Sequence, residues 1–188
     1  MTKQSGPWYN EEYLRQGSPT NATFAESVPR WAVTGNLAAL TTQVMTSVAL
    51  PLQAGDVVTS LTFVSATTAA GTPTNWWFAL YSPAGALLAQ TADQTSTAWA
   101  ANTAKKLALS APVLITQAGV YYAAVMVKAT TVPTLAGVPM HHATVAGDVA
   151  SLGSVVLAQT SGSSLTTTAP ATIATPTTVA TVPYVVAS

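Results

Sequence analysis

The sequence predicts an all-β protein, an antiparallel β-sandwich of jelly-roll type preceded by an extended N-terminal arm. From Trp31 onward, short runs of β-branched and aromatic residues are separated by Gly, Pro, Asn and Asp turn residues. This texture is typical of antiparallel sheets and not of alternating strands and helices. Residues 1–30 are instead rich in Gly, Pro and charge, which disfavours long helices or strands. We therefore expect an arm over 1–30 and a sandwich domain over 31–188.

The sandwich should contain eight strands, a number that suits a jelly roll or a related Greek-key sandwich. Ser-Pro-Ala-Gly at 82–85 predicts a tight hairpin, because Pro sets the backbone angle at the second position and Gly supplies the permissive one. The expected strands are 43–50, 57–66, 76–82, 86–91, 106–109, 120–129, 154–159 and 178–186.

Two segments allow more than one interpretation. The Ala-rich stretch 96–104 could form two helical turns, or a loop that crosses the sandwich with Trp99 as a plug. The Thr- and Pro-rich stretch 160–188 has the composition of a disordered linker. It ends in Val-Pro-Tyr-Val-Val, however, and Thr is a good strand residue. We expect an ordered loop that returns a final strand to the sheet.

Charge is scarce, because 12 of 188 residues are Asp, Glu, Lys or Arg, and half of these lie in the first 30 positions. An ordinary domain is about a quarter charged. A surface with few charges and a net charge of zero resists association poorly, so we expect the protein to lie against other protein. Nucleic acid is not an expected partner, since only two basic residues are adjacent. We also expect no membrane span and no secretion signal, because long apolar runs are missing.

Few residues are candidates for catalysis or for metal binding. Asp56, Asp93 and Asp148 follow or end expected strands and are interpreted as turn residues. His141 and His142 are adjacent, so on a strand they would point to opposite faces, and no metal-binding spacing supports them. Nucleotide-binding and nucleophile-elbow motifs do not occur in the sequence. We expect no catalytic residue, no metal and no cofactor.

Aromatic residues are the candidates for binding. In the arm, isolated rings among polar residues predict docking on a partner, because each ring buries a large apolar area when it finds a pocket. The alternatives are that the arm folds back over its own body or that it is simply frayed. The arm candidates are Trp8, Tyr9, Tyr13, Leu14 and Phe24.

Two aromatic doublets lie in expected strands of the body. One member of each doublet should face the core and the other should face outward. The outward members could anchor a subunit interface or form a sugar-stacking platform, and the low charge favours the interface. The residues considered for this role are Trp76, Trp77, Trp99, Tyr121 and Tyr122.

Residues 52–127 resemble the β-sandwich of virion proteins from tailed phages of actinobacteria, known as minor capsid, decoration, head-fibre or minor tail proteins. The resemblance extends over about 36–188. It is carried by the Gly55-Asp56 strand start, the strand and hairpin over 76–85, the insert Thr-Ala-Trp-Ala-Ala at 97–101, Gly-Val-Tyr-Tyr at 119–122, and the closing Pro-Tyr-Val at 183–185. It implies a non-enzymatic module, commonly trimeric, that is attached to a phage particle.

Within that group, the arm favours a capsid decoration or minor capsid protein. Decoration proteins often clamp the shell with a terminal arm while the body trimerises above it. A tail adhesin would more often carry a coiled coil, and no apolar heptads occur here. The resemblance thus implies a homotrimer on the capsid exterior, with the major capsid protein as partner. The alternative is a minor tail or head-fibre adhesion protein, or a carbohydrate-binding module that binds a host surface glycan.

Overall fold

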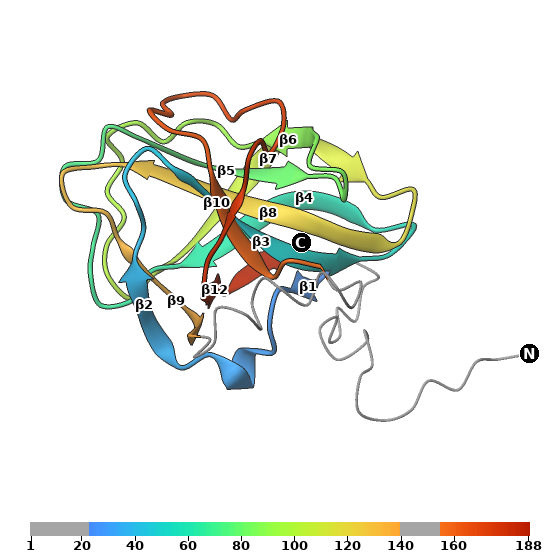
Figure 1. Ribbon diagram of the computed structural model, residues 1–188, viewed down its shortest axis with the longest axis horizontal. Helices are drawn as coiled ribbons and strands as arrows, with labels where there is room; N and C mark the ends of the chain where they lie inside the picture. Colours follow the sequence, from blue (N-terminus) through green and yellow to red (C-terminus); the bar gives the residue numbers. More distant parts are fainter. Residues whose placement is uncertain (1–22, 140–154) are drawn as a thin grey trace, which may run out of the picture.

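The computed structural model describes residues 23–139 and 155–188, which form an all-β sandwich (Figure 1). Neighbouring strands pair antiparallel throughout. In chain order the strands are β1 (Ala25–Glu26), β2 (Gly35–Ala39), β3 (Met45–Leu52), β4 (Val57–Val64), β5 (Asn75–Tyr81), β6 (Leu87–Gln90), β7 (Ala104–Leu114), β8 (Gly119–Lys128), β9 (Thr134–Pro139), β10 (Ala158–Ser161), β11 (Thr177–Thr178), β12 (Thr181–Pro183) and β13 (Val185–Ala187), with a 3-10 turn, η1 (Arg30–Ala32), after β1.

Two sheets form the layers of the sandwich, and a smaller third sheet lies beside them. The six-stranded sheet has the order β11-β10-β3-β8-β5-β6, and the four-stranded sheet has the order β1-β13-β4-β7. The third sheet, β12-β9-β2, is at the lower left of Figure 1. The chain passes from β3 to β4 to β5, and from β6 to β7 to β8, changing sheet at each step except β5 to β6. These crossovers confirm the predicted antiparallel sandwich.

An inner cluster of apolar side chains fills the space between the layers. Its aromatic centre is made by Trp76, Phe78 and Phe63 together with Trp99. The Trp76 and Trp99 rings stack with centroids 5.0 Å apart, and the Phe63 and Phe78 centroids are 4.7 Å apart. Segment 96–103 is a loop, and Trp99 has no exposed surface. The plug is therefore confirmed and the helical alternative is wrong, because burying the indole decides the path of this segment.

The predicted hairpin at 82–85 is confirmed. The Gly85 amide donates to the Ser82 carbonyl at 2.9 Å, and the Ser82 amide donates to the Ala86 carbonyl at 2.8 Å. Gly85 has a φ of 78°, a conformation that glycine adopts without a steric penalty. The turn residues thus define the junction between β5 and β6.

The Thr- and Pro-rich segment is ordered, as predicted, and the linker interpretation is wrong. Between β10 and β11 it runs as a loop over 162–176, the orange-red segment above β5 and β6 in Figure 1. Leu165, Ala169 and Ile173 of this loop pack on the outer face of the six-stranded sheet. With Met45, Trp77, Ala79, Tyr81, Ala124 and Met126 they form an outer cluster, bordered by Leu87 and Tyr122.

The final strand differs from the prediction, because 178–186 is divided into β11, β12 and β13. Pro183 ends β12, which pairs with β9, and the chain then joins the four-stranded sheet as β13 next to β4. Proline has no amide hydrogen for a continuous ladder, so the chain changes sheet at this residue. Strands β1, β2 and β9 were not predicted.

The ends of three other strands also differ from those that the sequence predicted. Strand β3 begins at Met45 and not at 43, because Gln43 has a φ of 59° and cannot extend the ladder. Strand β7 extends to Leu114 through Pro112, which is tolerated because β7 ends the order of its sheet. Strand β10 covers Ala158–Ser161, later than the expected 154–159, and its register against Val48–Met45 of β3 defines those ends.

Candidate functional site

The structure places the root of the arm, and only part of the predicted docking set lies in it. Trp8, Tyr9, Tyr13 and Leu14 are outside the described residues. Phe24 is partly buried, and the Arg30 guanidinium carbon lies 5.1 Å from the centroid of its ring. Ala25–Glu26 pair with β13 as strand β1, so the end of the expected arm belongs to the four-stranded sheet.

A buried carboxylate ties this root to the C-terminal strands. Glu26 is 2% exposed and accepts hydrogen bonds from Arg30 Nε, at 2.8 Å, and from the Tyr184 hydroxyl. Burial, together with the hydrogen bond to the charged Glu26, raises the pKa of Tyr184 above its ordinary value. The Ser27 hydroxyl donates to the Pro183 carbonyl at 2.9 Å and accepts from the Val185 amide at 3.0 Å. The arm therefore starts from a rigid base.

The described chain begins at Thr23, beside the start of β4. The Thr23 hydroxyl oxygen accepts a hydrogen bond of 2.8 Å from the Val57 amide. Val57 is opposite Leu114 in the β4–β7 register, and both side chains are exposed. The point of exit is thus next to an apolar surface.

Both tryptophans of the first doublet are fully buried. The two point to opposite faces of β5, as the alternation predicts: Trp76 lies in the inner cluster and Trp77 in the outer one. The Trp76 indole donates to the Thr97 carbonyl at 2.9 Å, and the Trp77 indole donates to the Thr166 carbonyl at 2.7 Å. Loop 162–176 covers the outward ring, so the expected surface position of Trp77 is wrong. The 0% exposure of Trp99 excludes it from the surface as well.

The tyrosine doublet follows the same pattern. Tyr121 is 6% exposed in the inner cluster, and its hydroxyl donates to the Gln117 carbonyl at 2.9 Å. Tyr122 packs beside the outer cluster and stays half-buried, and this burial raises the pKa of its phenol. Of the five body aromatics considered for an interface or ligand platform, Tyr122 alone keeps partial exposure.

The two described acids of the body have turn roles, as predicted. Asp56 Oδ2 accepts from the Gln53 amide at 2.7 Å. Asp93 accepts from the Trp76 amide at 2.9 Å and from Asn75 Nδ2 at 2.7 Å. Asp148, His141 and His142 lie outside the described residues. Within 23–139 and 155–188, no group of three His, Cys, Asp or Glu side chains could hold a metal ion.

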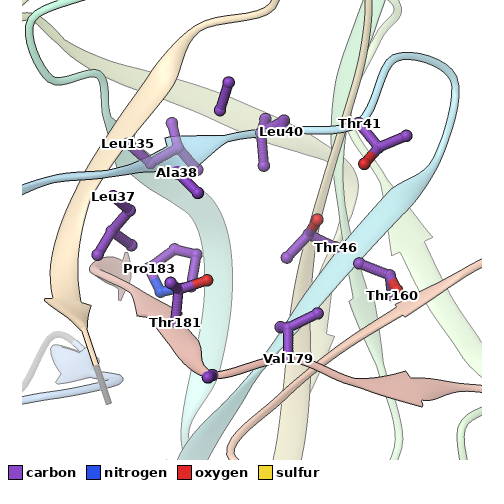
Figure 2. A pocket seen from close by; sticks show the side chains of 12 residues that line it. Leu37, Ala38, Leu40, Thr41, Thr46, Leu135, Thr160, Val179, Thr181 and Pro183 are labelled. Carbon is purple, nitrogen blue, oxygen red and sulfur yellow. The ribbon is translucent and has the colours of Figure 1, made fainter. Parts of the chain in front are cut away.

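A cleft of about 290 Å³ lies between the third sheet and the edge of the six-stranded sheet. Figure 2 shows Leu37, Ala38 and Leu40 on one side of it, and Val179, Thr181 and Pro183 on the other. The Thr46 and Thr160 side chains approach from β3 and β10. Its lining is aliphatic with threonine hydroxyls and has no titratable group, so the cleft offers no acid or base for catalysis.

A second hollow, which we name the hairpin-end groove, has a volume of about 510 Å³. It lies where the 82–85 turn meets the end of β7 and the start of β8, and none of its lining residues is charged. The groove is lined by Ser82, Pro83, Ala84, Leu88, Val113, Leu114, Ile115, Thr116, Gln117, Ala118, Gly119 and Tyr121. Leu88 is 40% exposed and Leu114 is 61% exposed, so this end of the sandwich presents aliphatic surface.

Our sequence reasoning missed this groove. A signal was present at Leu87-Leu88, because adjacent residues on a strand face opposite sides and one leucine had to point outward. Leu114 carried no such signal, since its neighbours in space come from the hairpin turn and from β4.

No family model matches the chain, and a search of curated proteins gives no significant match. Among the described residues, no helix is long and apolar enough to cross a membrane.

Proposed function

We propose that this protein is a structural protein of a phage virion, most specifically a capsid decoration or minor capsid protein. Its sandwich would form a homotrimer on the capsid exterior, and its N-terminal arm would attach the trimer to the major capsid protein. Cementing follows if buried arm aromatics and shared apolar faces lower the free energy of the assembled shell relative to free subunits.

One observation carries the proposal: the acids among the described residues bond within the chain, while aliphatic side chains stay exposed. Glu26, Asp56 and Asp93 each accept hydrogen bonds from the chain itself. Val57, Leu88 and Leu114 are between 40% and 61% exposed. Apolar surface of this kind marks contact with other protein, and a surface with few charges loses little hydration when it is covered.

The arm root supports attachment through residues 1–22. A segment that transmits load from a shell to a body needs a firm base, and β1 is held by β13, by the Glu26–Arg30 ion pair and by Ser27. The resemblance of 36–188 to phage virion sandwiches supports the particle and the trimer. The alternative of an adhesion or glycan-binding module has less support, because the aromatic doublets offer no exposed platform.

Deletion of residues 1–22 tests the attachment. The deletion stops before β1, so the sheet keeps its edge strand. We expect the shortened protein to keep its circular dichroism spectrum but to be lost from particles purified on a density gradient. A chain with the same 22 residues in scrambled order is the matched control and should be lost as well.

Normal incorporation of either variant contradicts the docking arm. Immunogold labelling of intact particles tests the location, and label on the tail contradicts a capsid role. Sedimentation of the purified full chain tests the trimer.

A further inference from the structure

The hairpin-end groove is an uncovered apolar hollow that has a candidate occupant nearby. Its exposed wall is made by Leu88 and Leu114, and its floor by the buried Ile115 and Tyr121. Its polar side chains are those of Ser82, Thr116, Gln117 and Tyr121, so no charged side chain lines the groove. Such a groove is suited to aromatic and aliphatic side chains.

The described chain begins near this groove, on the opposite side of strand β4. Thr23 is hydrogen-bonded to the Val57 amide, and Val57 is paired with Leu114 on the neighbouring strand. Paired strands lie about 5 Å apart. Thr23 bonds to the side of β4 that faces away from β7, so the 22 residues that precede it start about two strand spacings, roughly 10 Å, from the wall of the groove.

The arm contains a segment of matching chemistry. Trp8, Tyr9, Tyr13 and Leu14 place four large apolar side chains within 8–14. Eight residues, 15–22, lie between Leu14 and Thr23, and the nine Cα–Cα steps give a reach of about 30 Å. Gly17-Ser18-Pro19 lies within this connection and favours a reversal of the chain, so the segment can return to the body.

We propose that the hairpin-end groove binds segment 8–14 of the same chain. A short tether gives the segment an effective concentration in the millimolar range at its own groove, which exceeds that of any second copy in dilute solution. The free protein then stores its aromatic docking residues on its own body, and attachment to a shell must displace them. This inference goes beyond the proposed function and does not depend on it.

Limited trypsin digestion of the full chain tests the occupancy. Arg15 directly follows the segment and is one of six Lys and Arg residues. Binding of 8–14 should protect this site, because cleavage follows the population of the released arm. We expect Leu114→Asp to increase the rate of cleavage after Arg15 by about tenfold, since a carboxylate in the groove disfavours an apolar occupant.

Leu88→Asp provides a second groove variant in case Leu114→Asp fails to fold. Leu157→Asp is the matched control, because Leu157 is 38% exposed and does not line the groove. Thermal melting identifies folded variants. Equal cleavage rates in the wild type, a folded groove variant and the control overturn the proposal.

Disulfide trapping tests whether segment 8–14 in the groove comes from the same chain or from a second copy. The chain has no cysteine of its own to interfere. We expect Tyr13→Cys with Leu88→Cys to form a bond within one chain under mild oxidation, whereas Tyr13→Cys with Leu157→Cys should not, because a disulfide requires Cα atoms within about 7 Å. Bonds between chains in dilute protein, or equal bonding in both pairs, overturn the proposal. Neither result decides the outcome of the 1–22 deletion, because that experiment measures attachment to particles and the trapping measures where segment 8–14 lies in the free protein.

Discussion

The two faces of the six-stranded sheet both bury apolar side chains but are covered in different ways. The inner face packs against a regular four-stranded sheet, and the outer face packs against the irregular, Thr-rich loop 162–176. Trp76 on the inner face and Trp77 on the outer face each have 0% exposure, and each indole donates to a loop carbonyl. A segment of polar composition can therefore seal a core when a few apolar side chains and well-placed carbonyls face inward.

The largest expected effect comes from removing each indole. Trp76→Ala should lower the free energy of unfolding by about 3 to 5 kcal/mol, because the cavity lies between two sheets that cannot collapse into it. Trp77→Ala should cost about 1 to 2 kcal/mol less than Trp76→Ala, because the loop can move inward and reduce the cavity. Urea unfolding of both variants measures the difference. Equal losses would mean that the loop is as rigid as a sheet.

The next effect concerns a loop residue that supports the inner face. Asp93→Ala leaves the Trp76 amide without its 2.9 Å partner, and Trp76 is fully buried. Loss of the acceptor should lower the free energy of unfolding by about 1 to 3 kcal/mol. Thermal or urea unfolding checks it, with Thr95→Ala as a nearby exposed control. A neutral Asp93→Ala would show that water replaces the carboxylate.

Alkaline pH should act on the outer face. Burial raises the pKa of Tyr81, whose hydroxyl donates to the Pro170 carbonyl of the loop at 2.9 Å. A group with a raised pKa in the folded state contributes stability that is fully present below its unfolded pKa, about 10, and is lost as the pH rises above it. The urea midpoint should therefore fall above about pH 10.

Tyr81→Phe is the control for this titration. It removes one hydrogen bond, at a cost of about 0.5 to 1.5 kcal/mol at neutral pH, and should make the alkaline decline shallower. Tyr122 and Tyr184 also have raised pKa values, so part of the decline should remain. An unchanged slope in Tyr81→Phe would exclude Tyr81 as a contributor.

The smallest effect is expected at the junction of the hairpin and the loop. Gly85 has a φ of 78°, and a Cβ there would lie 3.4 Å from Ile173 Cβ. Gly85→Ala should cost about 1 kcal/mol from the left-handed backbone. Ala84→Gly, at the exposed neighbouring turn position, is the matched control and should have a smaller effect. A larger loss in Gly85→Ala than in Trp77→Ala would show that the turn, and not the indole, holds the loop.

Local patterns predicted much of the framework. The Ser-Pro-Ala-Gly turn, the β-branched or aromatic runs of β4, β5 and β8, and the turn acids Asp56 and Asp93 follow from backbone preferences and short-range hydrogen bonds. Strands β2 and β9 did not, because their pairing depends on a partner far along the chain. Gly137 illustrates this dependence, since a Cβ there would lie 2.3 Å from the Val182 carbonyl oxygen.

The candidate surfaces were less predictable than the strands. The alternation of Trp76 and Trp77 follows from strand geometry, whereas the covering of Trp77 depends on a loop about ninety residues away, whose Thr166 carbonyl accepts the indole proton. Leu114 is an exposed wall of the groove because β7 extends beyond the part of the strand that packs against the core.

The sequence by itself determined that this protein is an all-β sandwich with little charge and an aromatic-rich N-terminal segment, because strand propensity, turn chemistry and composition act over a few residues. Only the tertiary structure decided which apolar side chains stay exposed and where residues 23–26 join the sandwich. Exposure depends on what covers a residue, and here the cover comes from distant segments: loop 162–176 over Trp77, and strand β13 against the root of the arm.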